Sequence, residues 1–119
     1  MAEPDVIDRA SLDGLMAAAG GDQSFLAELI DAYLEDSPQQ LASMQRAMRG
    51  LDPEELRRAA HSLKSNSASL GAASLAAQCK ELEDLGHRGA FPEAALCLAR
   101  ARGEYEKVAQ SLRQIRAGL

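Results

Sequence analysis

Apolar residues recur at intervals of three and four along most of the chain, the spacing that places them on one face of an α-helix. A short stripe opens at Ser11 and ends at Gly20 and Gly21, because glycine tolerates the backbone angles that a helix end requires. Its apolar positions are Leu12, Leu15 and Met16. The pattern therefore predicts a short amphipathic helix near the N-terminus.

A longer stripe begins after Asp22, a good helix cap, and runs to Gly50. Its apolar positions are Phe25, Leu26, Leu29, Ile30, Tyr33, Leu34, Leu41, Met44 and Met48. The periodicity survives Pro38, so we favour one long bent helix. The alternative is a fresh start, with Ser37 as the cap and Pro38 in the first helical position.

Asp52 and Pro53, followed by two glutamates, form a strong helix start. The stripe that follows comprises Leu56, Ala60, Leu63, Ser67 and Leu70. We expect Asn66 and Ser67 to point toward the bundle side of this helix and to have structural roles. Gly71 is a possible end of this helix. A further stripe of Leu75, Cys79 and Leu82 then continues up to Gly86 and Gly89. Two more helices are therefore expected in this part of the chain.

The last helix is expected to open at residues 91–93, Phe-Pro-Glu, and to continue almost to the C-terminus. Leu98, Tyr105, Val108, Leu112 and Ile115 form its stripe. With only short connections between the helices, the pattern favours an all-α fold: an antiparallel up-and-down four-helix bundle with a short extra N-terminal helix. A length of 119 residues fits one domain, which we expect to span residues 1–119.

Composition supports this architecture and narrows the function classes. Hydrophobic residues make up 46% of the chain but aromatic ones only 3%, so Leu, Ala, Met, Ile and Val must fill the core. A net charge of -5 argues against a nucleic-acid binder, for which a basic stripe is expected. Cys79 and Cys97 lie inside helical patterns without neighbouring histidines, and we interpret them as small buried hydrophobes rather than a disulfide or zinc site.

The sequence also predicts a location. Its apolar runs are far shorter than the ~20 residues of a membrane span, and the N-terminus, with Glu3 and Asp5, lacks the plan of a signal peptide. We therefore expect a cytoplasmic protein with no membrane association. Met1 before a capped bundle favours a free-standing protein over a fragment of a hybrid kinase.

His61 is the candidate for chemistry. It lies roughly 150° from the centre of its helix's apolar stripe, so it faces away from the core. Its neighbours along the same helix face are two cations, Arg57 and Lys64, and two small residues, Ser65 one turn away and Ala68 two turns away. Positive charge and open space beside an imidazole suit phosphoryl transfer, in which a protein positions groups and stabilises negative oxygens. An exposed histidine on a solvated helix face is the alternative.

Residues 60–72, AHSLKSNSASLGA, resemble the signature of histidine-containing phosphotransfer (HPt) domains. The resemblance continues through Leu75, Cys79, Leu82 and Glu83, and it extends backward through residues 25–30 and 34–38, so it covers nearly the whole chain. It implies a helical bundle in which His61 accepts the phosphoryl group, Lys64 neighbours that group, and the next helix contributes a polar contact from about Glu83. Glu83 either accepts the inner N–H of the imidazole or is a plain surface acid.

The resemblance also implies the partners, which are response-regulator receiver domains and a hybrid histidine kinase. The receiver supplies the aspartate and Mg²⁺, so the chain itself is expected to be a monomeric phosphoryl carrier without autonomous catalysis and without a cofactor or metal. Leu12, Leu15 and Met16, together with Ala68, would form the centre of the receiver-binding patch, with Lys64 and Arg57 at its rim.

Two positions depart from the family pattern. Ser65 stands where the family usually has glycine, which narrows the space above the imidazole, and His87 stands where many relatives carry a basic residue. We expect His87 to be an exposed helix-end residue. Two alternatives to a phosphotransfer protein remain: a phosphorylation-independent adaptor or kinase-regulatory module, and an autonomous helical enzyme, for which no phosphate loop or catalytic triad is found.

Overall fold

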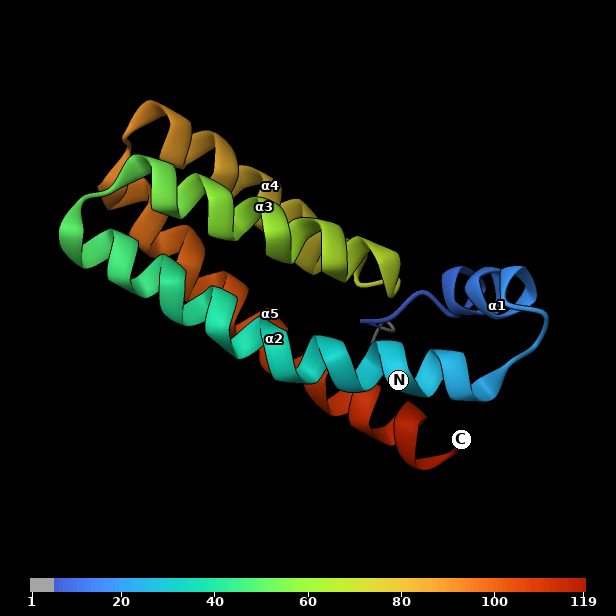
Figure 1. The fold of residues 1–119 in the computed structure, drawn as a ribbon. Helices are drawn as coiled ribbons and strands as arrows, with labels where there is room; N and C mark the ends of the chain where they lie inside the picture. Colours follow the sequence, from blue (N-terminus) through green and yellow to red (C-terminus); the bar gives the residue numbers. More distant parts are fainter. Residues whose placement is uncertain (1–5) are drawn as a thin grey trace, which may run out of the picture.

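The computed structural model describes residues 6–119, and within that range the secondary structure is entirely helical (Figure 1). The helices are α1 (Arg9–Ala18), α2 (Gln23–Gly50), α3 (Pro53–Ser69), α4 (Ala73–Arg88) and α5 (Phe91–Ala117). Helices α2 to α5 alternate in direction and form an antiparallel bundle, while α1 lies at the end where α2 begins and α3 turns into α4. The predicted all-α fold is confirmed, whereas Met1, Glu3 and Asp5 lie outside the described residues.

Side-chain caps set most helix starts. The Asp22 carboxylate accepts a hydrogen bond from the Ser24 amide, and Asp52 accepts one from the Glu55 amide, as the sequence predicts for α2 and α3. The start of α1 differs from the prediction. Its cap is Asp8, whose carboxylate also accepts from the Ser11 hydroxyl, so the helix begins before Ser11.

Helix α2 is continuous through Pro38, so the alternative of a fresh start there is wrong. Proline has no N–H and cannot donate to the carbonyl one turn back. The side chain of Ser37 donates to the carbonyl of Tyr33 at 2.5 Å, which adds a hydrogen bond at the same turn. Apolar contacts on both sides of the proline hold the two halves in one helix.

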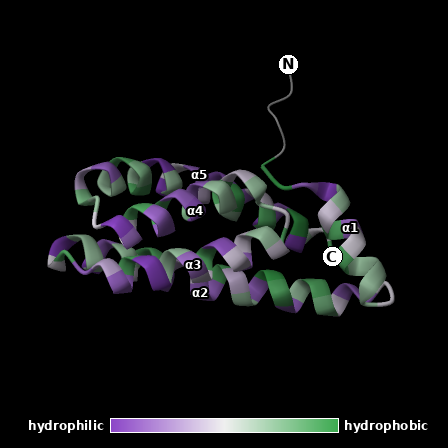
Figure 2. Cartoon of the chain, turned by 90° about the horizontal axis from the view of Figure 1, so that it is seen from above, coloured by the Kyte–Doolittle hydropathy of each residue, from purple (hydrophilic) through white to green (hydrophobic). Residues whose placement is uncertain are grey.

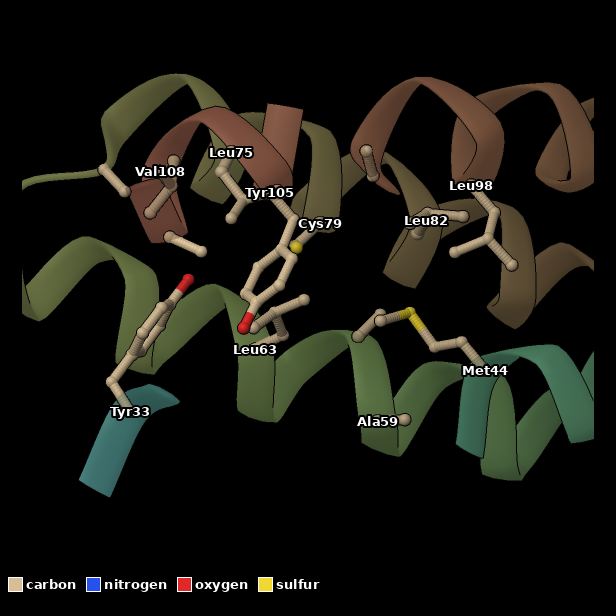
Figure 3. Close-up of a cluster of buried hydrophobic side chains, with 14 of the residues drawn as sticks. Tyr33, Met44, Ala59, Leu63, Leu75, Cys79, Leu82, Leu98, Tyr105 and Val108 are labelled. Atoms are coloured by element: carbon tan, nitrogen blue, oxygen red, sulfur yellow. The ribbon is translucent and has the colours of Figure 1, made fainter. Parts of the chain in front are cut away.

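The core lies between the four long helices, where their hydrophobic faces meet (Figures 2 and 3). The stripes predicted for α3 and α4 are buried, and so are Leu98, Tyr105, Val108 and Leu112 of α5. Cys79 and Cys97 are free and buried, as predicted. Burial raises the pKa of the Cys79 thiol to about 12 and that of Cys97 to about 11, so both stay protonated at neutral pH.

Four side-chain hydroxyls interrupt this apolar core, and we call them the hydroxyl cluster: Tyr33, Ser37, Ser67 and Tyr105. The Tyr33 hydroxyl is 2.9 Å from Ser67 Oγ, and the Tyr105 hydroxyl is 2.7 Å from Ser37 Oγ. Because Ser37 gives its only proton to the Tyr33 carbonyl, Tyr105 must donate to Ser37. The cluster joins α2 to both α3 and α5.

Two glycines let segments approach closely. A Cβ on Gly71, where φ is +80°, would lie 2.8 Å from the Asp8 carbonyl oxygen, and the Asp8 amide donates to the Gly71 carbonyl at 2.8 Å. This contact holds the start of α1 against the α3–α4 turn. A Cβ on Gly86 would lie 3.2 Å from Leu56 Cγ and 3.3 Å from the Arg57 amide nitrogen, so Gly86 permits the close packing of α4 on α3.

Between residues 6 and 119, none of the helices is both long and apolar enough to cross a membrane.

Candidate functional site

His61, Lys64 and Glu83 form a hydrogen-bonded group on the surface of α3 and α4, which we call the imidazole cluster. Glu83 Oε2 lies 2.8 Å from His61 Nδ1, and Glu83 Oε1 lies 2.7 Å from Lys64 Nζ. One carboxylate from α4 thus holds an imidazole and an ammonium that stand one turn apart on α3. The His61 side chain is 55% exposed, while Glu83 is only 15% exposed.

Helical phase places these side chains at the edge of the α3–α4 seam. His61 follows the buried Ala60 on α3, and Glu83 follows the buried Leu82 on α4, so each stands beside its helix's apolar face. Gly86 lies one turn beyond Glu83 on α4, where the missing Cβ lets the two helices come close. This close approach brings the carboxylate of Glu83 within hydrogen-bond distance of the imidazole.

The charge of Glu83 determines which ring nitrogen carries the proton. The hydrogen bond from Lys64 is the main cause that lowers the pKa of Glu83 below its ordinary value of 4.5, and the bond from His61 adds to it. Glu83 is therefore a carboxylate at neutral pH and can only accept hydrogen bonds. The proton of the neutral imidazole must then lie on Nδ1.

The outer nitrogen of the imidazole, Nε2, has its lone pair free. No side chain or backbone group in residues 6–119 forms a hydrogen bond with it. An exposed nitrogen lone pair on a ring held by a carboxylate is a positioned nucleophile. The nearby ammonium of Lys64 offers positive charge to an anion that approaches Nε2.

The supporting residues from the sequence lie around this cluster in different ways. Ser65 and Ala68 are exposed, which leaves space on the same face of α3. Arg57 forms an ion pair and two hydrogen bonds with Glu54, the residue one turn before it. Its guanidinium is thus engaged by an exposed acid of its own helix. His87 is exposed in the last turn of α4, as expected.

Two expectations about neighbouring residues need correction. Leu12 was expected in the surface patch but is only 3% exposed, because α1 turns this side chain into the core; Leu15 and Met16 are half-buried. Asn66 and Ser67 were both expected on the bundle side of α3. Ser67 is buried there, but Asn66 is exposed, since it stands 100° away on the helix.

The bond between Lys64 and Glu83 is the part of the site that the sequence analysis missed. A signal for it was present, because Lys64 stands one turn after His61 and a carboxylate that reaches the imidazole also lies near the lysine. Among residues 6–119, His, Cys, Asp and Glu side chains form no group of three or more that could hold a metal ion.

Two comparisons with known proteins give matches, one by sequence family and one by fold. A family model described as Hpt domain matches residues 28–118, which include all of α3 and α4. The chain is similar to the crystal structure of histidine-containing phosphotransfer protein B (HptB) from Pseudomonas aeruginosa PAO1, with 30% sequence identity, a TM-score of 0.89 and 99% of each chain covered. No curated protein matches the chain significantly.

Proposed function

The chain belongs to the Hpt domain family and takes part in histidine phosphotransfer within a phosphorelay, and we propose that His61 is the residue that carries the phosphoryl group. The observation that carries this proposal is the pairing of His61 Nδ1 with the Glu83 carboxylate, which leaves Nε2 exposed and nucleophilic. The only other histidine, His87, has no such partner within the described chain.

In the proposed step, Nε2 of His61 attacks the phosphorus of an aspartyl phosphate on a receiver domain. The N–P bond forms as the P–O bond to the aspartyl carboxylate breaks, and the aspartate leaves with the electron pair. No proton needs to move, because Nδ1 keeps its hydrogen. The ring becomes cationic, and the Glu83 carboxylate, 2.8 Å from Nδ1, stabilises that charge. The reverse reaction uses the same groups.

Lys64 has the second role in this proposal. Its ammonium is bound to Glu83 at 2.7 Å, one helical turn from the imidazole, and its side chain is 26% exposed. A phosphoryl group on Nε2 offers three anionic oxygens to the same ammonium. We infer that Lys64 then shares its hydrogen bonds between Glu83 and the phosphoryl oxygens. Arg57 stands at the rim of the site, and its pairing with Glu54 gives it a smaller role than Lys64.

Hpt proteins are phosphoryl carriers that act with kinases and response regulators in two-component relays. For this chain we propose a monomeric carrier without catalysis of its own, in which a receiver domain supplies the aspartate and Mg²⁺. The receiver would lie over the exposed Ser65 and Ala68 and reach the half-buried Leu15 and Met16 of α1. A single domain over residues 1–119 and a cytoplasmic location remain predictions from the sequence.

Incubation with a phosphorylated receiver domain tests the assignment. The wild-type chain should gain an acid-labile label, and His61→Gln should gain none. The matched control is His87→Gln, which removes the only other imidazole of the chain and should be labelled like the wild type. A labelled His61→Gln protein would move the acceptor to another residue. A wild-type chain that binds the receiver without becoming labelled would instead support the adaptor alternative.

A further inference from the structure

A groove of about 630 Å³ follows the seam between α2 and α5. In the bundle this seam is opposite the α3–α4 seam that carries the imidazole cluster, because the helices pack around the core in chain order. Its charged lining consists of four arginines and one glutamate: Arg46, Arg49, Arg102, Arg113 and Glu106. The groove is therefore strongly positive in a chain whose net charge is -5.

Most of these guanidinium groups are not neutralised by the chain itself. Arg46 approaches Glu55 at 3.7 Å, and Arg102 donates to the neutral amide of Gln45 at 3.1 Å. Arg49 and Arg113 form no ion pair within the portion of the chain that the structure covers. Elsewhere on the surface, by contrast, Arg57 and Arg116 bind Glu54 and Asp31 through two hydrogen bonds each.

The groove is long and has an apolar strip along it. Its α2 wall runs from Pro38 to Arg49 on one helical face, which is a length of about 16 Å at 1.5 Å per residue. Pro38, Leu41 and Ala42 contribute apolar surface, and the ring of Tyr105 lies beneath on α5. The packing of α2 against α5 is also the least extensive among the neighbouring helix pairs of the bundle, which leaves this seam open.

The arginines are distributed along this length. The hydrogen bond between Arg102 and Gln45 places Arg102 near Arg46 and Arg49, toward the end of α2. Arg113 stands eleven residues after Arg102 on the antiparallel α5, or about 16 Å further along the groove. A compact anion such as phosphate can bind at only one of these ends.

We propose that the α2–α5 groove binds an acidic amphipathic helix of a protein partner. A helix of about 11 residues matches the length of the groove, and its apolar side chains at three- and four-residue intervals would lie on the apolar strip. Glutamates and aspartates on its flanks would pair with the guanidinium groups, whose planar donors match carboxylates. Because the groove is remote from His61, this partner and a receiver domain can bind the chain at the same time.

Fluorescence polarisation with a designed peptide tests the proposal. The probe is a labelled helical peptide of about 12 residues, with leucines on one face and glutamates on the flanks. A scrambled peptide of the same composition has the same charge but no apolar face. We expect the amphipathic peptide to bind and the scrambled one to bind about tenfold more weakly or not at all.

Charge reversal locates the binding site. Arg46→Glu/Arg102→Glu should weaken binding of the amphipathic peptide about tenfold or more, since it reverses two rim charges. The matched control is Arg88→Glu/Arg100→Glu, which changes the net charge equally at two exposed arginines outside the groove and should bind nearly as well as the wild type. Circular dichroism checks that both variants remain folded.

Several outcomes would overturn the proposal. Equal binding of both peptides, or equal losses in both double variants, would reduce the interaction to non-specific charge attraction. Displacement of the peptide by millimolar inorganic phosphate at constant ionic strength would assign the groove to a compact anion. An NMR titration of the chain with the peptide would locate the contact through the chemical shifts of the backbone amides. Changes centred on α3 and α4 rather than on residues 38–49 would place the peptide at the imidazole cluster. Self-association of the chain that the groove variant abolishes would make a second copy the occupant.

Discussion

The hydroxyl cluster in the core and the imidazole cluster on the surface each join helices of the bundle through hydrogen bonds, but they leave their polar atoms in different states. In the core, every hydroxyl has a partner and none carries a charge. On the surface, a carboxylate serves two donors while the nucleophilic nitrogen beside it has no protein partner.

This difference follows from access to water. A buried polar group without a hydrogen bond costs free energy of folding, so the core tolerates hydroxyls only as a closed set. An exposed nitrogen is hydrated until another molecule replaces the water, so leaving it unpaired costs little. In this bundle the nucleophilic nitrogen can therefore remain without a protein partner because it is at the surface. The hydroxyls that join helices in the core all form hydrogen bonds.

The strongest test of this comparison places the same charge in both environments on α3. Ser67→Asp puts a carboxylate where the side chain is fully buried, and we expect a loss of about 3–5 kcal/mol in the free energy of unfolding because the group bonded at this position is the neutral hydroxyl of Tyr33. Ser65→Asp, two residues earlier and exposed, should change stability by less than about 0.5 kcal/mol. Urea unfolding measures both, and equal losses would contradict the comparison.

Removal of one core hydroxyl should have a smaller effect on stability and none on transfer. Tyr33→Phe leaves the buried Ser67 hydroxyl without its partner and should cost about 1–3 kcal/mol. His61→Gln should do the opposite, with unfolding free energy unchanged within about 0.5 kcal/mol and no phosphoryl acceptance. A Tyr33→Phe protein that folds but transfers slowly would link the two clusters and weaken the distinction.

Loss of the lysine tests whether its charge acts on the reaction rather than on the fold. Lys64→Ala should slow phosphoryl transfer about tenfold, which corresponds to about 1.4 kcal/mol of transition-state stabilisation by this half-buried ammonium. The control is Lys80→Ala on α4, whose ammonium pairs with Asp84 outside the site and should not affect transfer. Single-turnover transfer from a phosphorylated receiver gives both rates, and an unchanged rate for Lys64→Ala would remove the lysine from the mechanism.

The smallest expected effect is the pH dependence that Glu83 confers on stability. Its pKa in the folded chain is below the ordinary 4.5, so the carboxylate stabilises the fold above that value and this contribution is lost as pH falls through the lowered pKa. Glu83→Gln should therefore be less stable than the wild type by about 1 kcal/mol at pH 7, with the difference vanishing in stronger acid. Thermal unfolding across pH measures it.

The control for that measurement is Glu35→Gln, at an exposed glutamate of α2 that forms no ion pair within residues 6–119. It should show no comparable pH-dependent difference. A constant gap between wild type and Glu83→Gln at all pH values would mean that Glu83 acts through packing rather than charge.

Much of the fold could be predicted from local patterns. Both ends of α2 follow from Asp22 and Gly50, and the start of α3 follows from Asp52. The buried stripes follow from the spacing of apolar residues alone. The start of α1 was placed too late because Asp8 and Ser11 are both good capping residues, and only the bond from the Ala10 amide to the Asp8 carboxylate shows which one caps the helix. The sequence pattern did not predict that Leu12 is buried, because the burial of a short helix depends on which other helices it packs against.

The candidate site was predicted only in part. Exposure of His61 follows from its helical phase, and the structure agrees. The sequence left Glu83 between a positioning carboxylate and a surface acid, because that choice depends on a distance between two helices, which helical spacing does not supply. The pairing of Arg57 with Glu54, three residues earlier on the same helix, follows from helical spacing and could have been predicted.

The sequence by itself determined the helices, their apolar faces and the outward direction of His61, because each depends on residues within a few turns of one another. Only the tertiary structure decided which acid meets the imidazole, since Glu83 is 22 residues away from His61 and reaches it across a helix seam. That meeting depends on how closely α4 packs on α3 at Gly86. The interhelical distance is set by the packing of the whole core and cannot be read from either helix alone.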